Sequence, residues 1–267
     1  MSTNPLISPA LSITVNNVVR QRADLVGQYL LFSGISRKDC EAIVTLAREV
    51  KIARGKTIFF EGDLVQQVML LTAGSVKLFQ LGAQGTEVIL RVVGPGDVLC
   101  LKCFPEQSHC ATAIAVEHSA ALVWEARQFE TVKRRFPALE RNVTSVILET
   151  LNELEVRFRE VSTENVAPRL SGQLLRLIEH VGKPVDGCFE IVLSQKDLAQ
   201  LVGTTLFTVS RLLAQWEQRG IVKTRRNGVL LLDLAALREL SSFSKIVSPP
   251  LALQSERNQR RDDCGRS

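Results

Sequence analysis

The sequence predicts an α+β fold: an N-terminal antiparallel, jelly-roll-like β-roll, a long central helix and a C-terminal winged helix-turn-helix. Three observations predict it. Short β-rich runs separated by glycines fill residues 50–125, and apolar residues recur every three or four positions along 143–161. Two short amphipathic helices joined by a glycine then precede a hairpin within 194–231.

The composition limits the classes of protein to which the chain can belong. Its 267 residues, 45% of them hydrophobic and 23% charged, suffice for two modest globular domains. No apolar run approaches the roughly 20 residues of a membrane span, and the first residues do not form a secretory signal. We therefore expect a cytoplasmic protein with reduced thiols and no membrane partner, while a net charge of +5 permits an anionic partner.

The N-terminal region is expected to be only partly ordered. Residues 1–24 mix Ser, Thr, Asn and Pro without an apolar period, which predicts a disordered arm. A short helix is expected near 25–31. A second helix begins at Ser36, where Asp39 completes a capping pattern, and it ends near Arg48.

The β-roll is assigned to residues 25–136, which include the first two helices. Its strands are predicted at KTIFF, VQQVMLLT, SVKLFQ, EVILRVV, ATAIAV and ALVW. Glycines between these runs mark the turns, because a positive φ is cheap only for glycine. The runs follow one another at the spacing of an all-β roll.

The central helix is assigned to residues 137–164 and starts at Pro137, a residue well suited to a first helical turn. Its apolar seam comprises Val143, Ile147, Leu151, Leu154, Phe158 and Val161. The seam could pack on the chain's own β-roll. Its length of more than about five helical turns favours pairing with a second copy at a dimer axis.

The helix-turn-helix lies within a domain at 165–243, after a helix at RLSGQLLRLIEHV, a turn at GKPVDG and a strand at FEIVL. Ser194 and Asp197 cap a short helix, Gly203 makes the turn, and a second helix covers 205–218. The inward stripe of this second helix is predicted to be Leu206, Val209, Leu213 and Trp216. A polar tail, 244–267, is expected to be disordered.

The outward face of the second helix indicates that the protein binds DNA. Phe207, Ser210 and Arg211 stand at i, i+3 and i+4 near its N-terminus, so they project together. Arg211 can donate two hydrogen bonds to the major-groove edge of guanine. Hydroxyl groups suited to phosphate contacts belong to Thr204, Thr205 and Thr208.

A basic hairpin follows. The run IVKTRRNGVLLL predicts two strands joined by Asn227-Gly228, a wing whose Lys223, Arg225 and Arg226 can neutralise phosphates. A pair of helices joined by a glycine is, taken alone, as often an ordinary helical hairpin as a DNA-binding motif. The helix pair, the basic wing and the seam in this order together favour DNA binding.

These motifs resemble the Crp/Fnr family over residues 25–240. The β-roll signatures are FEGD at 60–63, LTAGSVKLF at 71–79 and GPGDVL at 94–99, and LSQKDLAQLVGTTLFTVSRLLAQWEQRGIV matches the helix-turn-helix. The resemblance implies a homodimer that binds a palindromic operator, with RNA polymerase as a partner and a signal sensed in the β-roll.

Two departures limit what the resemblance implies. Family members that bind cAMP place a glutamate where Leu101 stands and an arginine–serine pair at Cys110 and Ala111. Without that cation the cyclic phosphate would be buried unpaired, which argues against cAMP as the effector. Many members also carry a glutamate at Phe207, which here could pack on a thymine methyl group instead, whereas Ser210 and Arg211 are kept.

A cysteine cluster lies in the loop that would hold a nucleotide. Its members are Cys100, Cys103 and Cys110, with His109 adjacent. Three interpretations stay open: an iron–sulfur cluster or zinc site, a redox-switchable disulfide, or no cofactor, with cysteines that are only small apolar residues. A fourth ligand from Cys40 or Cys188 would require the fold to bring it close.

The sequence thus predicts a sequence-specific transcription regulator rather than an enzyme. The alternatives are a cupin-like metal enzyme and a cyclic-nucleotide-binding-like regulatory module that does not bind DNA. A cupin site needs several histidines projecting from strands, and His109, His118 and His180 do not form such a set. His118 and His180 are predicted to be ordinary surface or packing residues.

Overall fold

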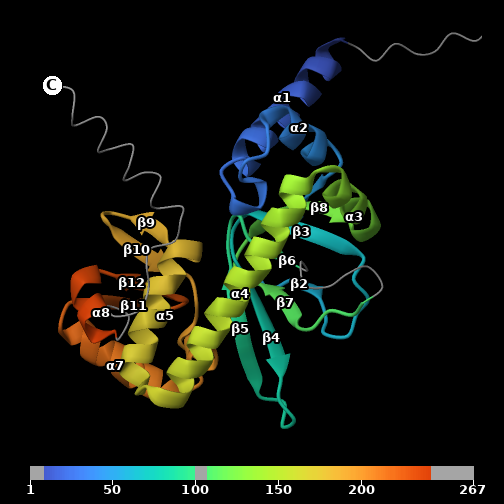
Figure 1. Cartoon of the computed structure of the whole chain (residues 1–267). Coiled ribbons are helices and arrows are strands. Elements are labelled where there is room, and N and C mark those ends of the chain that lie inside the picture. Colours follow the sequence, from blue (N-terminus) through green and yellow to red (C-terminus); the bar gives the residue numbers. More distant parts are fainter. Residues whose placement is uncertain (1–8, 100–106, 242–267) are drawn as a thin grey trace, which may run out of the picture.

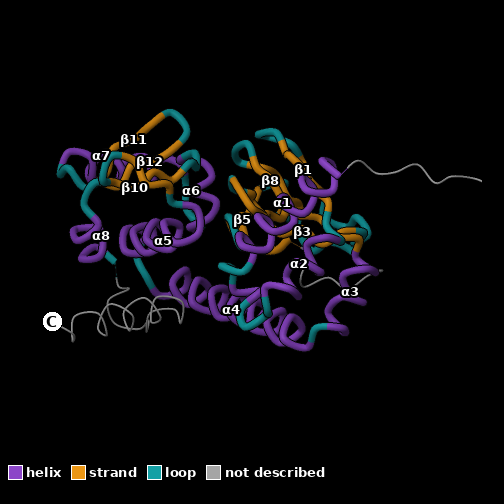
Figure 2. The backbone as a smooth tube through the Cα atoms, turned by 90° about the horizontal axis from the view of Figure 1, so that it is seen from above, coloured by secondary structure: helices purple, strands orange, loops and turns teal. Residues whose placement is uncertain are grey.

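The structure, a computed structural model, describes residues 9–99 and 107–241 and consists of two lobes joined by one long helix (Figure 1). The N-terminal lobe is a β-roll with short helices, and the C-terminal lobe combines helices with a small sheet. Figure 2 shows that α4 (Pro137–Thr163) runs alongside both lobes. The polar tail expected at 244–267 lies outside the described residues.

The N-terminal helices differ from the prediction. Helix α1 (Pro9–Val26) occupies most of the segment expected to be a disordered arm, so that prediction is wrong from residue 9 onward. Val19, Ala23 and Val26 recur at helical spacing and pack in the apolar cluster of the β-roll, and this tertiary contact stabilises a segment of polar composition. No α-helix spans 25–31, where a 3-10 turn, η1 (Leu30–Phe32), is found instead.

Helix α2 (Arg37–Thr45) begins as predicted. The Ser36 hydroxyl accepts a hydrogen bond from the Asp39 backbone N–H at 3.2 Å, which satisfies one free donor of the first turn. The helix ends before Arg48 because that residue opens the first strand.

Within residues 9–99 and 107–136, the β-roll comprises two four-stranded antiparallel sheets, ordered β1-β8-β3-β6 and β2-β7-β4-β5. The strands are β1 (Arg48–Ile52), β2 (Thr57–Phe59), β3 (Gln67–Ala73), β4 (Val76–Leu81), β5 (Glu87–Val93), β6 (Val98–Leu99), β7 (Thr112–Ala115) and β8 (Ser119–Glu125). All six predicted runs form strands. The additional strands β1 and β6 were missed because one is rich in charge and the other has two residues.

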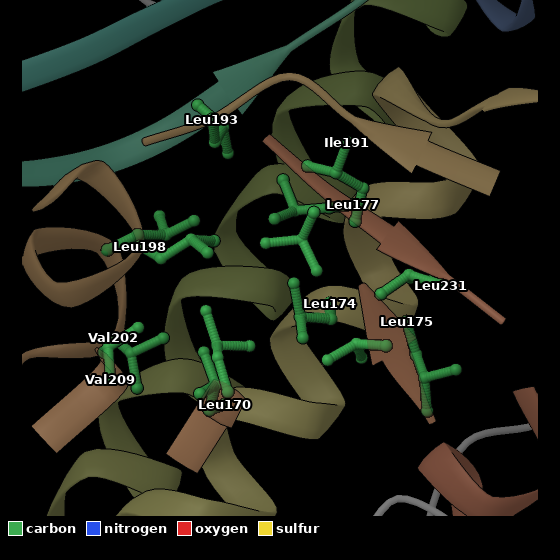
Figure 3. Packing of buried hydrophobic residues seen from close by; sticks show 14 of the residues in the cluster. Leu170, Leu174, Leu175, Leu177, Ile191, Leu193, Leu198, Val202, Val209 and Leu231 are labelled. Carbon is green, nitrogen blue, oxygen red and sulfur yellow. The ribbon is translucent and has the colours of Figure 1, made fainter. Parts of the chain in front are cut away.

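The C-terminal lobe follows α3 (Ala126–Arg135) and α4. Its elements are α5 (Val166–Val181), β9 (Lys183–Val185), β10 (Cys188–Ile191), α6 (Gln195–Val202), α7 (Leu206–Gln218), β11 (Val222–Arg225), β12 (Gly228–Leu231) and α8 (Leu234–Leu240). Its four strands pair in the order β11-β12-β10-β9. Leu170 and Leu174 from α5 pack with Leu198 and Val209 of the two following helices (Figure 3).

One predicted turn of this lobe is wrong. The segment GKPVDG contains β9, and only Asp186 and Gly187 form the turn, with φ of +47° and +79°. Positive φ at both central residues is typical of the tight turn that joins two antiparallel strands. The hairpin β9–β10 thereby extends the wing sheet at the edge opposite β11.

Candidate nucleic-acid interface

Local hydrogen bonds fix the turn between α6 and α7. Ser194 and Asp197 form a complete capping box at the start of α6, as predicted. Gly203 ends the helix with a φ of +70°, a conformation that costs glycine little. At the start of α7 the Thr205 hydroxyl accepts from the Thr208 backbone N–H at 3.2 Å. The end of α6 and the beginning of α7 are therefore both defined by caps.

The inward stripe of α7 is shorter than predicted. Val209, Leu213 and Trp216 are buried in the core of the lobe. Leu206 is 51% exposed, so its assignment to the stripe is wrong. Leu206 is the first residue of the helix. Val202 of α6 and Val209 of α7 pack in the core of the lobe, and Leu206 is not part of that core.

The outward face of α7 agrees with the prediction. Phe207 is 75% exposed, and Ser210 and Arg211 are also exposed. Within the residues that the structure describes, Arg211 forms no ion pair. Its guanidinium is therefore available to an external acceptor.

The wing is formed by β11 and β12. Arg225 pairs with Gly228, so the connecting residues are Arg226 and Asn227 rather than the predicted Asn227-Gly228. Gly228 is buried, and an added Cβ would lie 2.6 Å from the Ile191 carbonyl oxygen. This glycine is needed for the close approach of β10 and not for the turn.

The charges of the wing are unequal. Arg225 Nη1 lies 3.0 Å from Oε1 of Glu190, whereas Lys223 and Arg226 are exposed and form no ion pair in the described part of the chain. Hydrogen bonds from the side chain and backbone of Thr224 lower the pKa of Glu217, and these bonds fasten the wing to α7. Two cations therefore remain free beside α7.

The seam of α4 divides into two parts. Val143 is 6% exposed and packs in the chain's own core, so its assignment to a dimer contact is wrong, and Ile147 lies against the same core. Leu154 is half-buried. The exposed seam residues are Leu151, Phe158 and Val161, with Leu148 exposed beside them.

Two basic side chains fasten the C-terminal lobe to the β-roll. Lys77 Nζ on β4 lies 2.7 Å from Oδ1 of Asp197 on α6. Arg157 on α4 donates to the carbonyl oxygens of Ile89 at 3.1 Å and Leu201 at 2.8 Å, and so joins β5 to α6. Burial lowers the pKa of Arg157 to about 10, which still leaves it charged at neutral pH.

His180, at the end of α5, makes a further contact between the lobes that the sequence did not predict. Its Nδ1 lies 3.6 Å from Oδ2 of Asp97, and its Nε2 lies 3.6 Å from Oε1 of Glu153 on α4. The Asp97 carboxylate raises the pKa of His180, although burial opposes the shift. Gly94, near Asp97, lies so close to the end of α5 that an added Cβ would overlap the His180 carbonyl oxygen.

Comparison with known proteins identifies both lobes. The model of the cyclic nucleotide-binding domain matches residues 49–136, and the model of the Crp-like helix-turn-helix domain matches residues 168–240. The chain belongs to the Crp/Fnr family. Members of this family are transcription regulators that bind DNA as dimers.

Individual members of the family match most of the chain. The cyclic AMP receptor protein of Thermus thermophilus is 28% identical over 79% of this chain and 96% of its own length. The fumarate and nitrate reduction regulatory protein of Vibrio cholerae is 22% identical over 75% of this chain and 81% of its own length. FixK2 from Bradyrhizobium japonicum shares the fold, with a TM-score of 0.67 and 23% identity over 73% of this chain and 98% of its own.

The structure describes only part of the loop that contains the predicted cysteine cluster. Cys100, Leu101 and Cys103 lie outside the described residues. Cys110 is exposed, and its carbonyl oxygen accepts from Gln80 Nε2 at 2.6 Å. Cys40 is buried and Cys188 is half-buried, and in the described ranges no three His, Cys, Asp or Glu side chains are grouped to hold a metal ion.

Of the two members of the predicted cysteine–histidine set that the structure describes, Cys110 is exposed and His109 is buried. Its ring stacks on Phe59 with centroids 3.7 Å apart, and its backbone N–H donates to the Asp63 carbonyl oxygen. Burial lowers the pKa of His109, although Asp63 opposes the shift. The geometry is that of a packed, neutral imidazole at the base of the loop.

Proposed function

We propose that this Crp/Fnr member is a homodimeric, sequence-specific transcription regulator that inserts α7 into the major groove of a palindromic operator. The observation that carries the proposal is the exposed face of Phe207, Ser210 and Arg211, with an unpaired guanidinium beside a basic hairpin. Among the described helices, none combines the length and apolar character needed to cross a bilayer. We assign it to the cytoplasm, with RNA polymerase as a partner and no enzymatic activity.

Each group at the interface has a distinct chemical role. Arg211 offers a planar pair of donors that match O6 and N7 of guanine. Lys223 and Arg226 contact phosphates, and together with the hydroxyls of Thr204 and Thr208 they fix the register of α7. Arg225 contributes less, because Glu190 already neutralises it. Thr205 acts mainly by capping the helix that presents these groups.

The exposed part of α4 supports the proposed dimer. Leu151, Phe158 and Val161 recur at helical spacing on a helix of 27 residues. Pairing this seam with its copy would remove the apolar surface from water and place two α7 helices on one side of the duplex. The half-sites would then lie about one helical turn apart.

The signal is proposed to act through the β-roll and not through cAMP. Cys110 and Ala111 offer no cation where the resemblance places one. The signal is proposed to act on the thiols of Cys100, Cys103 and Cys110, either by metal binding or by disulfide formation. His109 is an additional candidate ligand for a metal. A signal there would reach α6 through the contacts of Lys77 and Arg157 with the C-terminal lobe.

Selection of bound sequences from a randomised duplex pool tests this function. We expect a two-fold symmetric consensus, and Arg211→Ala should bind the selected duplex about 10- to 100-fold more weakly. Lys223→Ala should reduce the slope of affinity against salt by about two, because the dimer loses one phosphate contact in each subunit. The matched control is Arg219→Ala at the other end of α7, which should bind almost normally. Failure to enrich any duplex at low ionic strength would contradict the proposal.

A further inference from the structure

Helix α7 begins with two adjacent large apolar side chains that face solvent. Leu206 is 51% exposed and Phe207 is 75% exposed, and only Phe158 exceeds Phe207 among the exposed large apolar residues of the described chain. A single exposed apolar residue requires no explanation. Two of them side by side at the start of α7, the helix proposed to enter the major groove, form a patch that suggests a ligand.

The surroundings of this patch indicate what covers it. Leu206 and Ser210 are one turn apart, as are Phe207 and Arg211, so the apolar pair lies directly beside the polar pair. The residues from Thr204 to Arg211 include no acidic side chain. An occupant that satisfies all of these groups must be anionic, must accept hydrogen bonds and must also offer small apolar groups.

Duplex DNA meets all three requirements in its major groove. Phosphates supply the charge, guanine supplies the acceptors, and the C5-methyl group of a pyrimidine is the apolar group that the base edges present there. The positive charge of Lys223 and Arg226 on the neighbouring wing also favours a polyanion.

We infer that Leu206 and Phe207 read C5-methyl groups of pyrimidines, next to the guanine bound by Arg211. The inference rests on the proposed function and specifies its substrate. Side chains one helical turn apart lie about 5–6 Å from each other, and neighbouring bases are about 3.4 Å apart. The methyl-bearing base is therefore one or two base pairs from the guanine. Thymine and 5-methylcytosine both present this group.

Removal of single methyl groups from DNA tests the inference. In the duplex selected from the randomised pool, each thymine is replaced in turn by uracil, which differs only by the methyl group. At one or two positions near the guanine we expect about fourfold weaker binding, the effect of one buried methyl group. Phe207→Ala and Leu206→Ala should each abolish the loss at one of these positions. Leu232→Ala, at an exposed apolar residue beyond β12, is the control and should keep it.

A second set of duplexes distinguishes the two sources of the methyl group. At a sensitive position the thymine–adenine pair is replaced by cytosine–guanine and by 5-methylcytosine–guanine. Recovery of affinity with 5-methylcytosine supports recognition of the methyl group on either base, and lack of recovery supports thymine alone.

Two outcomes would overturn the inference. One is a uracil scan in which every position stays within twofold while Arg211→Ala still weakens binding, because DNA binding would then persist without methyl recognition. The other is a change of oligomeric state in Phe207→Ala with an unaltered uracil response, which would assign the patch to a protein contact. If no duplex is selected at all, the proposed function itself fails.

Discussion

The two halves of α4 turn the same side toward the rest of the chain, but the residues on that side change from apolar to polar. In the first half, Leu139 and Val143 are buried in the same apolar cluster as Trp124 of β8. In the second half, the buried side chains are the polar Thr150 and Glu160. From residue 148 onward, four large apolar residues of the helix are exposed: Leu148, Leu151, Phe158 and Val161.

This change of polarity is expected of a helix that packs on its own chain along one side and on a second copy along the other. The inward polar side is satisfied within the chain, because Arg176 holds Glu160 through two contacts of 2.7 Å and Arg91 donates to the Thr150 hydroxyl at 3.1 Å. An apolar side left in water has no such compensation. The outward side of the second half therefore matches what a second copy of α4 would cover.

Replacing Phe158 by Glu should produce the largest effect, because it places two charges in the proposed dimer contact. We expect the dissociation constant of the dimer to rise on the order of 100-fold, as measured by sedimentation. Phe158→Leu keeps the apolar character and is the control. A Phe158→Glu protein that is still dimeric at low micromolar concentration would refute the assignment of this side to a dimer.

Replacing Val143 by Ala tests the first half of the helix. The cavity left in the core should lower the free energy of unfolding by about 1–3 kcal/mol. Thermal melting of the Phe158→Glu protein with and without Val143→Ala measures the loss without a contribution from dimerisation. The dimer constant of the single Val143→Ala protein should not change, and a clear change would mean that the two halves are not separate in function.

The smallest effect is expected from pH at the polar inward side. The pKa of His180 is raised, so its ionic contact with Asp97 and Glu153 is complete below the unfolded value near 6.5 and is lost as pH rises through the folded value. The pKa of Asp97 is lowered despite burial, so this carboxylate stays ionised across that range. Hydrogen exchange at the end of α5 should detect looser docking at high pH.

Because about a third of the imidazole is exposed to solvent, the change should stay below about 1 kcal/mol. His180→Gln should abolish the pH dependence, whereas His118→Gln, at an exposed histidine of the β-roll, should retain it. Equal pH dependence in both variants would show that another group titrates.

Local signals in the sequence were sufficient where one short-range interaction determines the structure. Ser194, Asp197 and Gly203 specify α6 and its end by capping and by a positive φ, and both were predicted. Both strands of the wing were also predicted, but the position of the turn between them was not. Gly228 resembles a turn residue, and only the position of the Ile191 carbonyl shows that it is needed for packing.

Longer-range contacts could not be predicted. The spacing of the α4 seam is the same along its length, so it does not reveal that Val143 faces the chain's own core while Phe158 does not. Leu206 continues the stripe of α7 in sequence but lies beyond the edge of the core. His180 acquires its role from Asp97, which is 83 positions earlier, because the fold brings the two lobes together.

The contact at Gly94 has a consequence for how the two lobes can evolve. The β-roll and α5 meet there with no room for a side chain, so one added methyl group would push apart the β-roll and the lobe that contains the helix-turn-helix. Gly94→Ala would change neither a cysteine of the predicted cluster nor a residue of the proposed DNA-binding face, yet it would force the lobes apart. A single nucleotide change could thus produce a regulator with intact parts and broken communication.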